Sequence, residues 1–337
     1  MKVRKIKYYK MTKSKIDVYQ NVTDTFIQSL KNNKIPWKRP WNPNGPHINY
    51  LSKRPYRGIN PLLLQASSDI NEFTSPYWLT YKQADQLSFK KWLKNTGNKN
   101  DKNSWILYKK DKESYCGVKL SEKSTLITYW TMFKGDSRDK FDENGNPEKV
   151  MIPFLKYIYV FNTEQTDLAI EVEKPEEIEF NPIERAEEVI ENWEDKPEIK
   201  HVGDRAFYRP STDSITMPKQ EAFHSPEEYY KTLFHESVHA TGHKSRLDRI
   251  KHDSFGDEKY SKEELVAEIG SSMLSQRCDI ETEVSDNSIA YVQGWISKLK
   301  SDKKLIVSAA GKAQKACDLI LGETYEVEDT YKKDSNE

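Results

Sequence analysis

The sequence has few cysteines and no long hydrophobic run. Cys116, Cys278 and Cys317 are scattered over 337 residues, which is not the pattern of a disulfide framework, and no two of them have metal-ligand spacing. No apolar run approaches the roughly 18 residues of a membrane helix, and the basic start lacks the apolar segment of a signal peptide. We therefore expect a cytoplasmic protein and exclude a secreted disulfide-rich domain and an integral membrane protein.

A net charge is also lacking, because 53 Lys and Arg balance 53 Asp and Glu. The balance hides a division between the two halves of the chain. Residues 1–165 hold 30 basic and 15 acidic residues, whereas residues 166–337 hold 23 and 38, so the halves carry +15 and −15. The first half therefore predicts contact with a polyanion, and the second does not.

The pattern that indicates chemistry is HESVH, which begins at His235. Ser-Pro-Glu-Glu at 225–228 is typical of a helix start, and Gly242 is typical of a helix end. His235 and His239 would lie on one face of this helix, where both imidazoles can bind one Zn²⁺. Glu236 would then stand beside the open coordination position as a general base. The alternative is a pair of partly buried structural histidines.

The third ligand decides the kind of metal site. A histidine six residues after the second one is excluded, because Ser245 occupies that position. Residues 261–270 instead supply Glu264 and Glu268, one helical turn apart. We expect Glu264 to bind the metal and Glu268 to orient a histidine; Glu268 as the ligand, or Glu264 as a helix cap only, are the alternatives. His243 is expected near the metal or the substrate, and a plain surface histidine fits equally well.

The hydrophobic patterns predict an α+β protein of two domains. Residues 1–166 form the first, with helices at 14–32, 61–68 and after Thr80. The β-branched and aromatic runs at 104–108, 125–130 and 156–161 predict strands of a small antiparallel sheet, with a turn at 142–147.

The second domain, at 181–322, is predicted to be mainly helical. An acidic linker at 167–180 precedes it, and a disordered tail at 323–337 follows it. Its one hairpin, at 206–217, offers an edge strand that can pair with an extended peptide beside the metal. Helices are predicted from 181, at 287–300 and at 302–321.

Aromatic and basic residues alternate in the first half. Tryptophan beside Lys and Arg in a proline-flanked, extended segment can stack on unpaired bases while the charges meet phosphates. A core position is the alternative for the tryptophans at 37 and 41. The candidate DNA-binding residues are Trp37, Lys38, Arg39, Trp41, Lys53, Arg54, Tyr56, Arg57 and Trp78.

These motifs together resemble the ArdC family of antirestriction proteins, over nearly the whole chain. The motifs are Ile35-Pro36-Trp37 with Pro40-Trp41, Tyr56-Arg57-Gly58-Ile59-Asn60, Trp78 to Ala84, Val160 to Gln165, Tyr229-Tyr230 with His235 to His239, Gly242 to Leu247, and Glu263 to Glu268. The chain departs from the family at 95–100, where a glycine-lysine-rich turn is common. The resemblance implies an N-terminal domain that binds single-stranded DNA, joined to a C-terminal zincin-like metallopeptidase domain. It also implies protection of mobile DNA from host restriction.

We therefore predict an antirestriction protein of a mobile element or phage that acts in the host cytoplasm. It would bind single-stranded DNA and hold one Zn²⁺ on His235, His239 and Glu264, with Glu236 as the catalytic base. Its peptide substrate would be a host restriction or defence protein. The alternative is a DNA-shielding protein whose zinc domain is structural, or an interaction module without turnover.

Overall fold

The computed structural model describes residues 16–32, 34–37, 45–111, 115, 117–143, 145–172, 181–250, 258–280 and 289–324. The expected α+β fold is confirmed, because small sheets are combined with long helices. Residues 173–180 of the expected linker and 325–337 of the expected tail lie outside the described residues. The division into domains at residue 166 stays a prediction.

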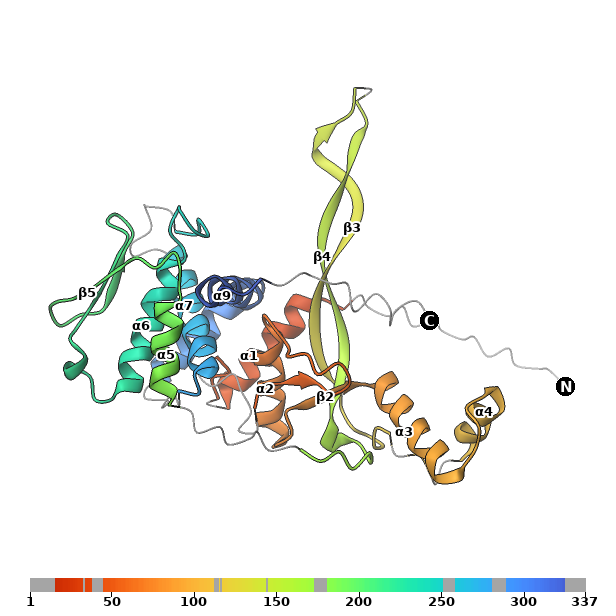
Figure 1. The fold of residues 1–337 in the computed structure, drawn as a ribbon. Coiled ribbons are helices and arrows are strands. Elements are labelled where there is room, and N and C mark those ends of the chain that lie inside the picture. Colours follow the sequence, from red (N-terminus) through yellow and green to blue (C-terminus); the bar gives the residue numbers. More distant parts are fainter. Residues whose placement is uncertain are drawn as a thin grey trace.

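The N-terminal region contains a mixed four-stranded sheet. Its strands are β1 (Ile48–Asn49), β2 (Tyr77–Thr80), β3 (Thr125–Phe141) and β4 (Pro147–Asn162), in the order β1-β2-β4-β3. The β1–β2 pair is parallel and the other two pairs are antiparallel. The β3 and β4 strands extend far beyond the predicted runs and form a long hairpin that projects from the body (Figure 1). Its turn lies where the sequence predicted it, with Gly145 at φ 79°, a conformation that glycine adopts readily.

Four helices belong to this region. They are α1 (Val18–Lys31), α2 (Asn60–Asn71), α3 (Tyr81–Thr96) and α4 (Lys102–Lys110), with a short 3₁₀ turn η1 (Thr163–Gln165) after β4. Three were predicted. Of the four, α1, α2 and α3 contact the sheet and α4 packs on α3. The start of α3 is fixed by a capping box, in which Thr80 accepts from the backbone of Gln83 and the Gln83 side chain accepts from the backbone of Thr80. Two of the donors that a helix start leaves unpaired are thereby satisfied.

The prediction of a strand at 104–108 is wrong, because these residues lie in α4. Asp101 caps this helix by accepting the backbone N–H of Ser104 at 2.9 Å. Tyr108 packs against Phe89 and Trp92 of α3 in a small separate core. An Asp-x-x-Ser start and a helical partner thus override the strand preference of a Trp-Ile-Leu-Tyr run.

The C-terminal region is mainly helical, as predicted. Its elements are α5 (Pro182–Glu191), β5 (Glu198–His201), β6 (Phe207–Arg209), β7 (Ser214–Met217), η2 (Gln220–Ala222), α6 (Pro226–Ala240), α7 (Glu258–Arg277), α8 (Ile289–Ser301) and α9 (Leu305–Leu321). The predicted hairpin is confirmed as β6 and β7, and β5 adds a parallel strand on the other side of β7. This leaves β6 as the edge strand that packs next to α6.

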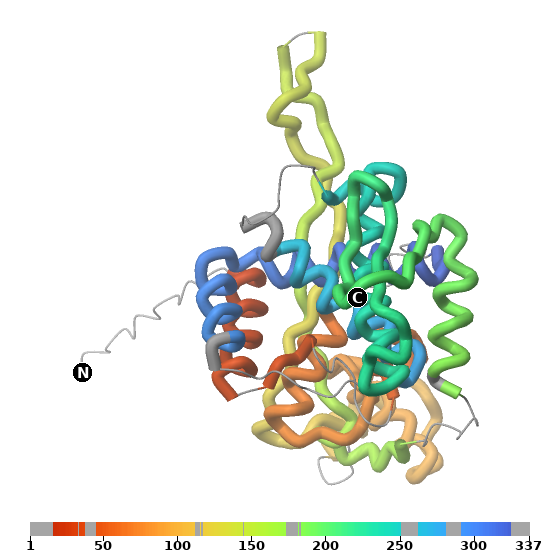
Figure 2. Tube along the Cα trace, turned by 90° about the vertical axis from the view of Figure 1, so that its left-hand side faces the viewer, coloured from red at the N-terminus to blue at the C-terminus, as the bar shows by residue number. Residues whose placement is uncertain are grey.

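The largest hydrophobic core contains residues from both ends of the chain. Helix α1 packs against α8 and α9, and in Figure 2 the red N-terminal helix stands beside the blue C-terminal helices. Phe26, Leu30 and Trp37 are fully buried in the same cluster as Leu299 and Ile306. The N-terminal segment therefore completes the core around the C-terminal helices. Among the described residues, no helix combines the length and the hydrophobicity needed to cross a membrane.

The only histidine among residues 1–165 is His47, which is 2% exposed. Its Nδ1 accepts the Trp78 indole N–H at 3.0 Å, and its Nε2 lies 3.1 Å from Gln65 Oε1. Burial lowers the pKa of His47 from 6.5 to about 4, although the hydrogen bond that the ring donates to Gln65 Oε1 opposes this shift. The native imidazole is therefore neutral down to about pH 4.

We expect His47 to make stability depend on pH. The unfolded imidazole binds a proton near pH 6.5 and the native one near pH 4, so the unfolded state is favoured as pH falls through this window, by about 3 kcal/mol at most. The thermal-unfolding midpoint of the native chain should fall more between about pH 7 and about pH 5 than that of a His47→Gln variant. Equal falls in the two proteins would contradict this role.

Candidate metal centre

Helix α6 carries both histidines of the HExxH pattern. Ser225 caps its start by accepting the backbone N–H of Glu228 at 3.2 Å, and Pro226 is its first residue, as predicted. At the other end, Arg249 donates to the carbonyl of Val238 and to the Thr241 hydroxyl, both at 2.8 Å. The last turn is thus held in place by a side chain that satisfies its free carbonyl.

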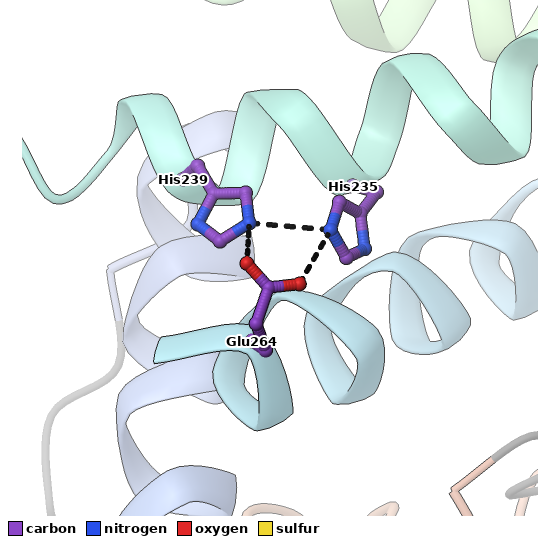
Figure 3. A group of neighbouring side chains, drawn as sticks. All are labelled: His235, His239 and Glu264. Carbon is purple, nitrogen blue, oxygen red and sulfur yellow. Dashed lines mark hydrogen bonds and ion pairs between the residues drawn. The ribbon is translucent and has the colours of Figure 1, made fainter. Parts of the chain in front are cut away.

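Three side chains converge beside this turn, as Figure 3 shows. His235 Nε2 and His239 Nε2 are 3.2 Å apart; Glu264 Oε1 lies 3.3 Å from His239 Nε2, and Glu264 Oε2 lies 3.5 Å from His235 Nε2. Among the described residues, these three form a group of donors with metal-ligand spacing. Ligand atoms about 2.0–2.1 Å from a tetrahedral ion must be about 3.3–3.4 Å apart. One ligand atom from each of the three side chains lies within 4.8 Å of the other two, so the group could close on one ion.

The charges of the three side chains support one another. Burial alone would raise the pKa of Glu264, but hydrogen bonds from His235 and His239 outweigh it and hold that pKa well below its usual range. Burial opposes protonation of His235, yet its hydrogen bond to Glu264 and the charge of Glu236 raise its pKa. The group is thus a negatively charged oxygen between two imidazole nitrogens. That is a donor set which zinc and other divalent ions accept.

Helix α7 brings Glu264 to the histidines and keeps Glu268 away from them. The helix begins at residue 258, so Glu264 lies inside it and not at a capping position. Gly270 allows α7 to approach α6, since a Cβ there would lie 2.7 Å from Val238 Cγ2. Glu268 Oε2 instead accepts the Trp37 indole N–H at 3.0 Å and the Tyr291 hydroxyl at 2.5 Å. Of the two glutamates, the geometry favours Glu264 as the ligand.

Glu263 is a residue of the site that sequence reasoning missed. Its Oε1 lies 4.0 Å from His239 Nδ1, on the side of the ring away from Glu264, and accepts from Arg249 at 2.8 Å. A carboxylate on this side of a metal-binding histidine orients the ring. At 4.0 Å this contact is longer than a hydrogen bond, so Glu263 is a second candidate for the orienting role, and the role predicted for Glu268 stays a prediction. The adjacent pair of glutamates at 263 and 264 was the only sequence signal.

Glu236 is turned toward the edge strand. Its Oε2 accepts the backbone N–H of Tyr208 on β6 at 2.8 Å, and the residue is 8% exposed. Tyr208 pairs with Ile215 of β7. This contact places the carboxylate of Glu236 between the metal-binding helix and the strand predicted to hold a peptide.

His243 lies outside the group of three donors. Its Nδ1 is 2.7 Å from the Ser245 hydroxyl and 3.7 Å from Asp213 Oδ2. Asp213 is in turn held by Arg246 and by the Tyr208 hydroxyl at 2.8 Å. This network ties the loop after α6 to the β6–β7 hairpin. A structural role for His243 therefore has direct support, whereas a role at the substrate stays a prediction.

The tryptophans proposed to stack on DNA are largely core residues. Trp37 and Trp78 are fully buried, and Tyr56 is 8% exposed. Trp37 packs against Phe26 and Trp295. A ring enclosed in this way has no free face for a base, so the alternative of a core position describes Trp37 in this structure.

The basic candidates differ in exposure. Lys53 and Arg54 are exposed, whereas Arg57 is paired with Asp318 of α9 at 2.5 Å. Lys38, Arg39 and Trp41 lie outside the described residues. Of the six predicted DNA contacts that the structure describes, Lys53 and Arg54 are the two exposed ones.

The HExxH helix, the glutamate on the next helix and the edge strand together define a zincin-like metallopeptidase domain, and residues 184–312 match the family described as zincin-like metallopeptidase. Residues 16–161 match the N-terminal domain of the anti-restriction factor ArdC. Two solved structures are similar over nearly their whole length. The metal-free antirestriction protein ArdC from plasmid R388 is 33% identical, with a TM-score of 0.63, and the match covers 90% of this chain and 97% of that one. Its Mn(II)-bound form is 31% identical, with a TM-score of 0.64, and the match covers 93% of this chain and 100% of that one. The chain belongs to the ArdC family of antirestriction proteins.

Curated relatives include longer proteins. DNA primase TraC of Escherichia coli is 35% identical over 323 residues, which is 90% of this chain but 20% of that protein; a second TraC is 34% identical and matched over 28% of its length. The chain thus spans a fifth to under a third of these relatives. The uncharacterized protein y4eC of Sinorhizobium fredii (strain NBRC 101917 / NGR234) is 30% identical over 91% of its length.

Proposed function

We propose that this antirestriction protein binds single-stranded DNA through its N-terminal region and carries a zinc metallopeptidase site in its C-terminal domain. The observation that supports the site is the convergence of His235, His239 and Glu264 at separations of 3.2–3.5 Å. The observations that support the DNA partner are the match to the ArdC N-terminal domain and the charge of +15 on residues 1–165. Counterion release favours binding of such a region to phosphates.

Zinc is the ion we propose, one per chain. Two imidazole nitrogens and one carboxylate are the donors of many catalytic zinc sites, which leave the fourth position open. The related R388 protein has a Mn(II)-bound structure, so a site of this family accepts a divalent ion.

A divalent ion bound to these residues would lower the pKa of water and polarise a peptide carbonyl. Glu236 would accept the proton of the attacking water and later give it to the leaving amine. Glu263 would hold the ring of His239 in position through its Nδ1 side. The edge strand β6 would align an extended peptide through backbone hydrogen bonds. The backbone N–H of Tyr208 on this strand donates to Glu236, so Glu236 would lie beside the bound peptide.

The proposed peptide substrate is a host restriction or defence protein, met in the cytoplasm of the host cell. The proposed role of DNA binding is to place the peptidase on incoming single strands. The rival function is DNA shielding, with a metal domain that is structural or an interaction module without turnover. Peptide cleavage needs a general base and DNA shielding does not, so a variant of Glu236 distinguishes the two functions.

Replacement of Glu236 by glutamine should abolish peptide cleavage and leave DNA binding unchanged. The amide keeps the shape and still accepts the N–H of Tyr208, but it cannot take a proton, so cleavage should fall by a factor of about 10² to 10⁴. Cleavage is measured by mass spectrometry on a peptide mixture from a proteome digest, and DNA binding on a labelled oligonucleotide. Glu221→Gln is the matched control, since Glu221 is exposed and lies before the metal helix.

Two outcomes decide against the proposal. Equal cleavage by the native chain and the Glu236→Gln variant would remove Glu236 from catalysis. Antirestriction activity that survives in the Glu236→Gln variant, with no cleavage by the metal-loaded native chain, would favour the shielding function.

A further inference from the structure

Helices α3 and α4 form an arm with its own small core. Phe89 and Trp92 of α3 pack against Tyr108 of α4, apart from the larger clusters of the molecule. Trp105 packs its ring edge-to-face on Phe89, with centroids 4.6 Å apart. In Figure 1 the arm extends to the side away from α5, α6 and the small C-terminal sheet. It therefore presents most of its surface to solvent.

The arm is the most basic described segment of the chain. Residues 81–111 contain three aspartates and no glutamate, against eight lysines: Lys82, Lys90, Lys91, Lys94, Lys99, Lys102, Lys109 and Lys110. By contrast, the β3–β4 hairpin at 125–162 has five basic and five acidic residues. The positive charge of the described N-terminal region is thus gathered on this arm.

Each aspartate of the arm is used to hold its fold. Asp85 accepts the Tyr108 hydroxyl at 3.0 Å and Lys109 Nζ at 2.7 Å. Asp101 caps α4, and Asp111 accepts the Trp92 indole N–H at 2.8 Å. Each of these acids is thus bonded within the arm, and Asp85 is also buried, so the three leave most of the lysine charge of the arm uncompensated.

Of the lysines, Lys109 takes part in this fold, since it pairs with Asp85 and lies over the Trp105 ring. All eight are exposed, and in the part of the chain that the structure describes only Lys109 of the eight forms an ion pair. Lys90, Lys91 and Lys94 share a single helical turn. Like charges at this spacing destabilise a helix by about 0.2–0.5 kcal/mol per pair, so the chain keeps an arrangement that folding alone does not favour.

We propose that the lysine face of the α3–α4 arm binds the phosphates of single-stranded DNA, a site that rests on the DNA binding proposed above. Lysines spaced along two helices can follow a flexible backbone and release its counterions. A membrane surface is less suited to the arm. Trp105, Ile106 and Leu107 are consecutive and so point in directions about 100° apart, whereas an interfacial helix needs one continuous apolar face.

The test uses the full chain and a variant with Lys90→Gln, Lys91→Gln and Lys94→Gln. Its probe is a fluorescein-labelled oligothymidylate of roughly thirty nucleotides, longer than the site of a single binding fold. Each phosphate contact on a single strand contributes about 0.7 to the slope of log affinity against log salt. The variant should therefore lose about 2 from this slope, and about hundredfold in affinity at 0.1 M salt.

The matched control carries Lys300→Gln, Lys312→Gln and Lys315→Gln. These three lysines are exposed on α8 and α9, so the control changes the net charge equally. It should bind like the native chain. Circular dichroism and the thermal midpoint check that each variant is folded, and Lys82→Gln with Lys102→Gln and Lys110→Gln provides a second test of the same face.

The outcomes separate this site from the function on which it rests. If both arm variants keep the native affinity and the native slope of log affinity against log salt, the proposed site on the arm is wrong, while DNA binding by the chain still stands. Absence of salt-sensitive binding by the native chain would overturn both. Binding of phosphatidylserine vesicles that the arm variants lose, with no binding of the oligonucleotide, would identify a membrane surface and also overturn the proposal.

Discussion

A Glu264→Ala variant should fail to retain a metal ion that the native chain binds. Among the described residues, Glu264 is the one that brings carboxylate oxygens to both Nε2 atoms, at 3.3 and 3.5 Å. Loss of a residue that merely orients a ligand lowers metal affinity by about 10–100-fold, so loss of a ligand should exceed about hundredfold. The bound metal is measured by mass spectrometry after gel filtration, and the affinity by competition with a chromophoric chelator.

Glu268→Ala is the control for the Glu264 variant, because the two glutamates are one turn apart on the same helix. Glu268 is bonded to Trp37 and Tyr291 and to neither metal-binding histidine. Its loss should lower the thermal midpoint but leave about one ion per chain. A full metal content in the Glu264 variant would refute the site, and loss of the ion only in the Glu268 variant would transfer the ligand role to Glu268.

The metal site was largely predictable because its signals are local. Two histidines at i and i+4 define a helix face, and the serine cap and proline at 225 and 226 fix where that helix begins. The distinction between Glu264 and Glu268 was not local, since both lie on one face of α7. The choice between the two glutamates depends on how α7 packs against α6. Gly270 permits this close packing because it has no side chain.

The DNA-binding surface was hard to predict because aromatic residues are common both in hydrophobic cores and in sites that bind nucleic acids. The segment before Trp37 gave no sign that the ring would be enclosed by Phe26 of α1 and by Trp295 of α8, more than 250 residues later in the chain. A strand was likewise expected at 104–108, where contacts to Phe89 instead stabilise a helix. In both cases a partner that is distant in sequence decides the outcome, and periodicity does not report it.

Replacement of Trp37 by alanine should destabilise the C-terminal domain although Trp37 lies in the N-terminal part of the sequence. The ring is fully buried between Phe26 and Trp295, and its N–H donates to Glu268 at 3.0 Å. Removal of a buried tryptophan costs about 3–5 kcal/mol, and Glu268 would lose one of its donors. The thermal midpoint of unfolding should therefore fall sharply.

Two further variants separate this structural role from DNA stacking. Trp37→Phe should keep most of the packing and recover much of the midpoint, while Trp130→Ala, at a ring that is 52% exposed, should change it little because surface substitutions are usually within about 0.5 kcal/mol. An unchanged midpoint in Trp37→Ala, together with lost binding of single-stranded DNA, would contradict the structural role and restore Trp37 as a base-stacking residue. A lowered midpoint instead means that residues 181–322 expressed without α1 and Trp37 would lack part of their core, so the zincin-like domain should be studied in the full chain.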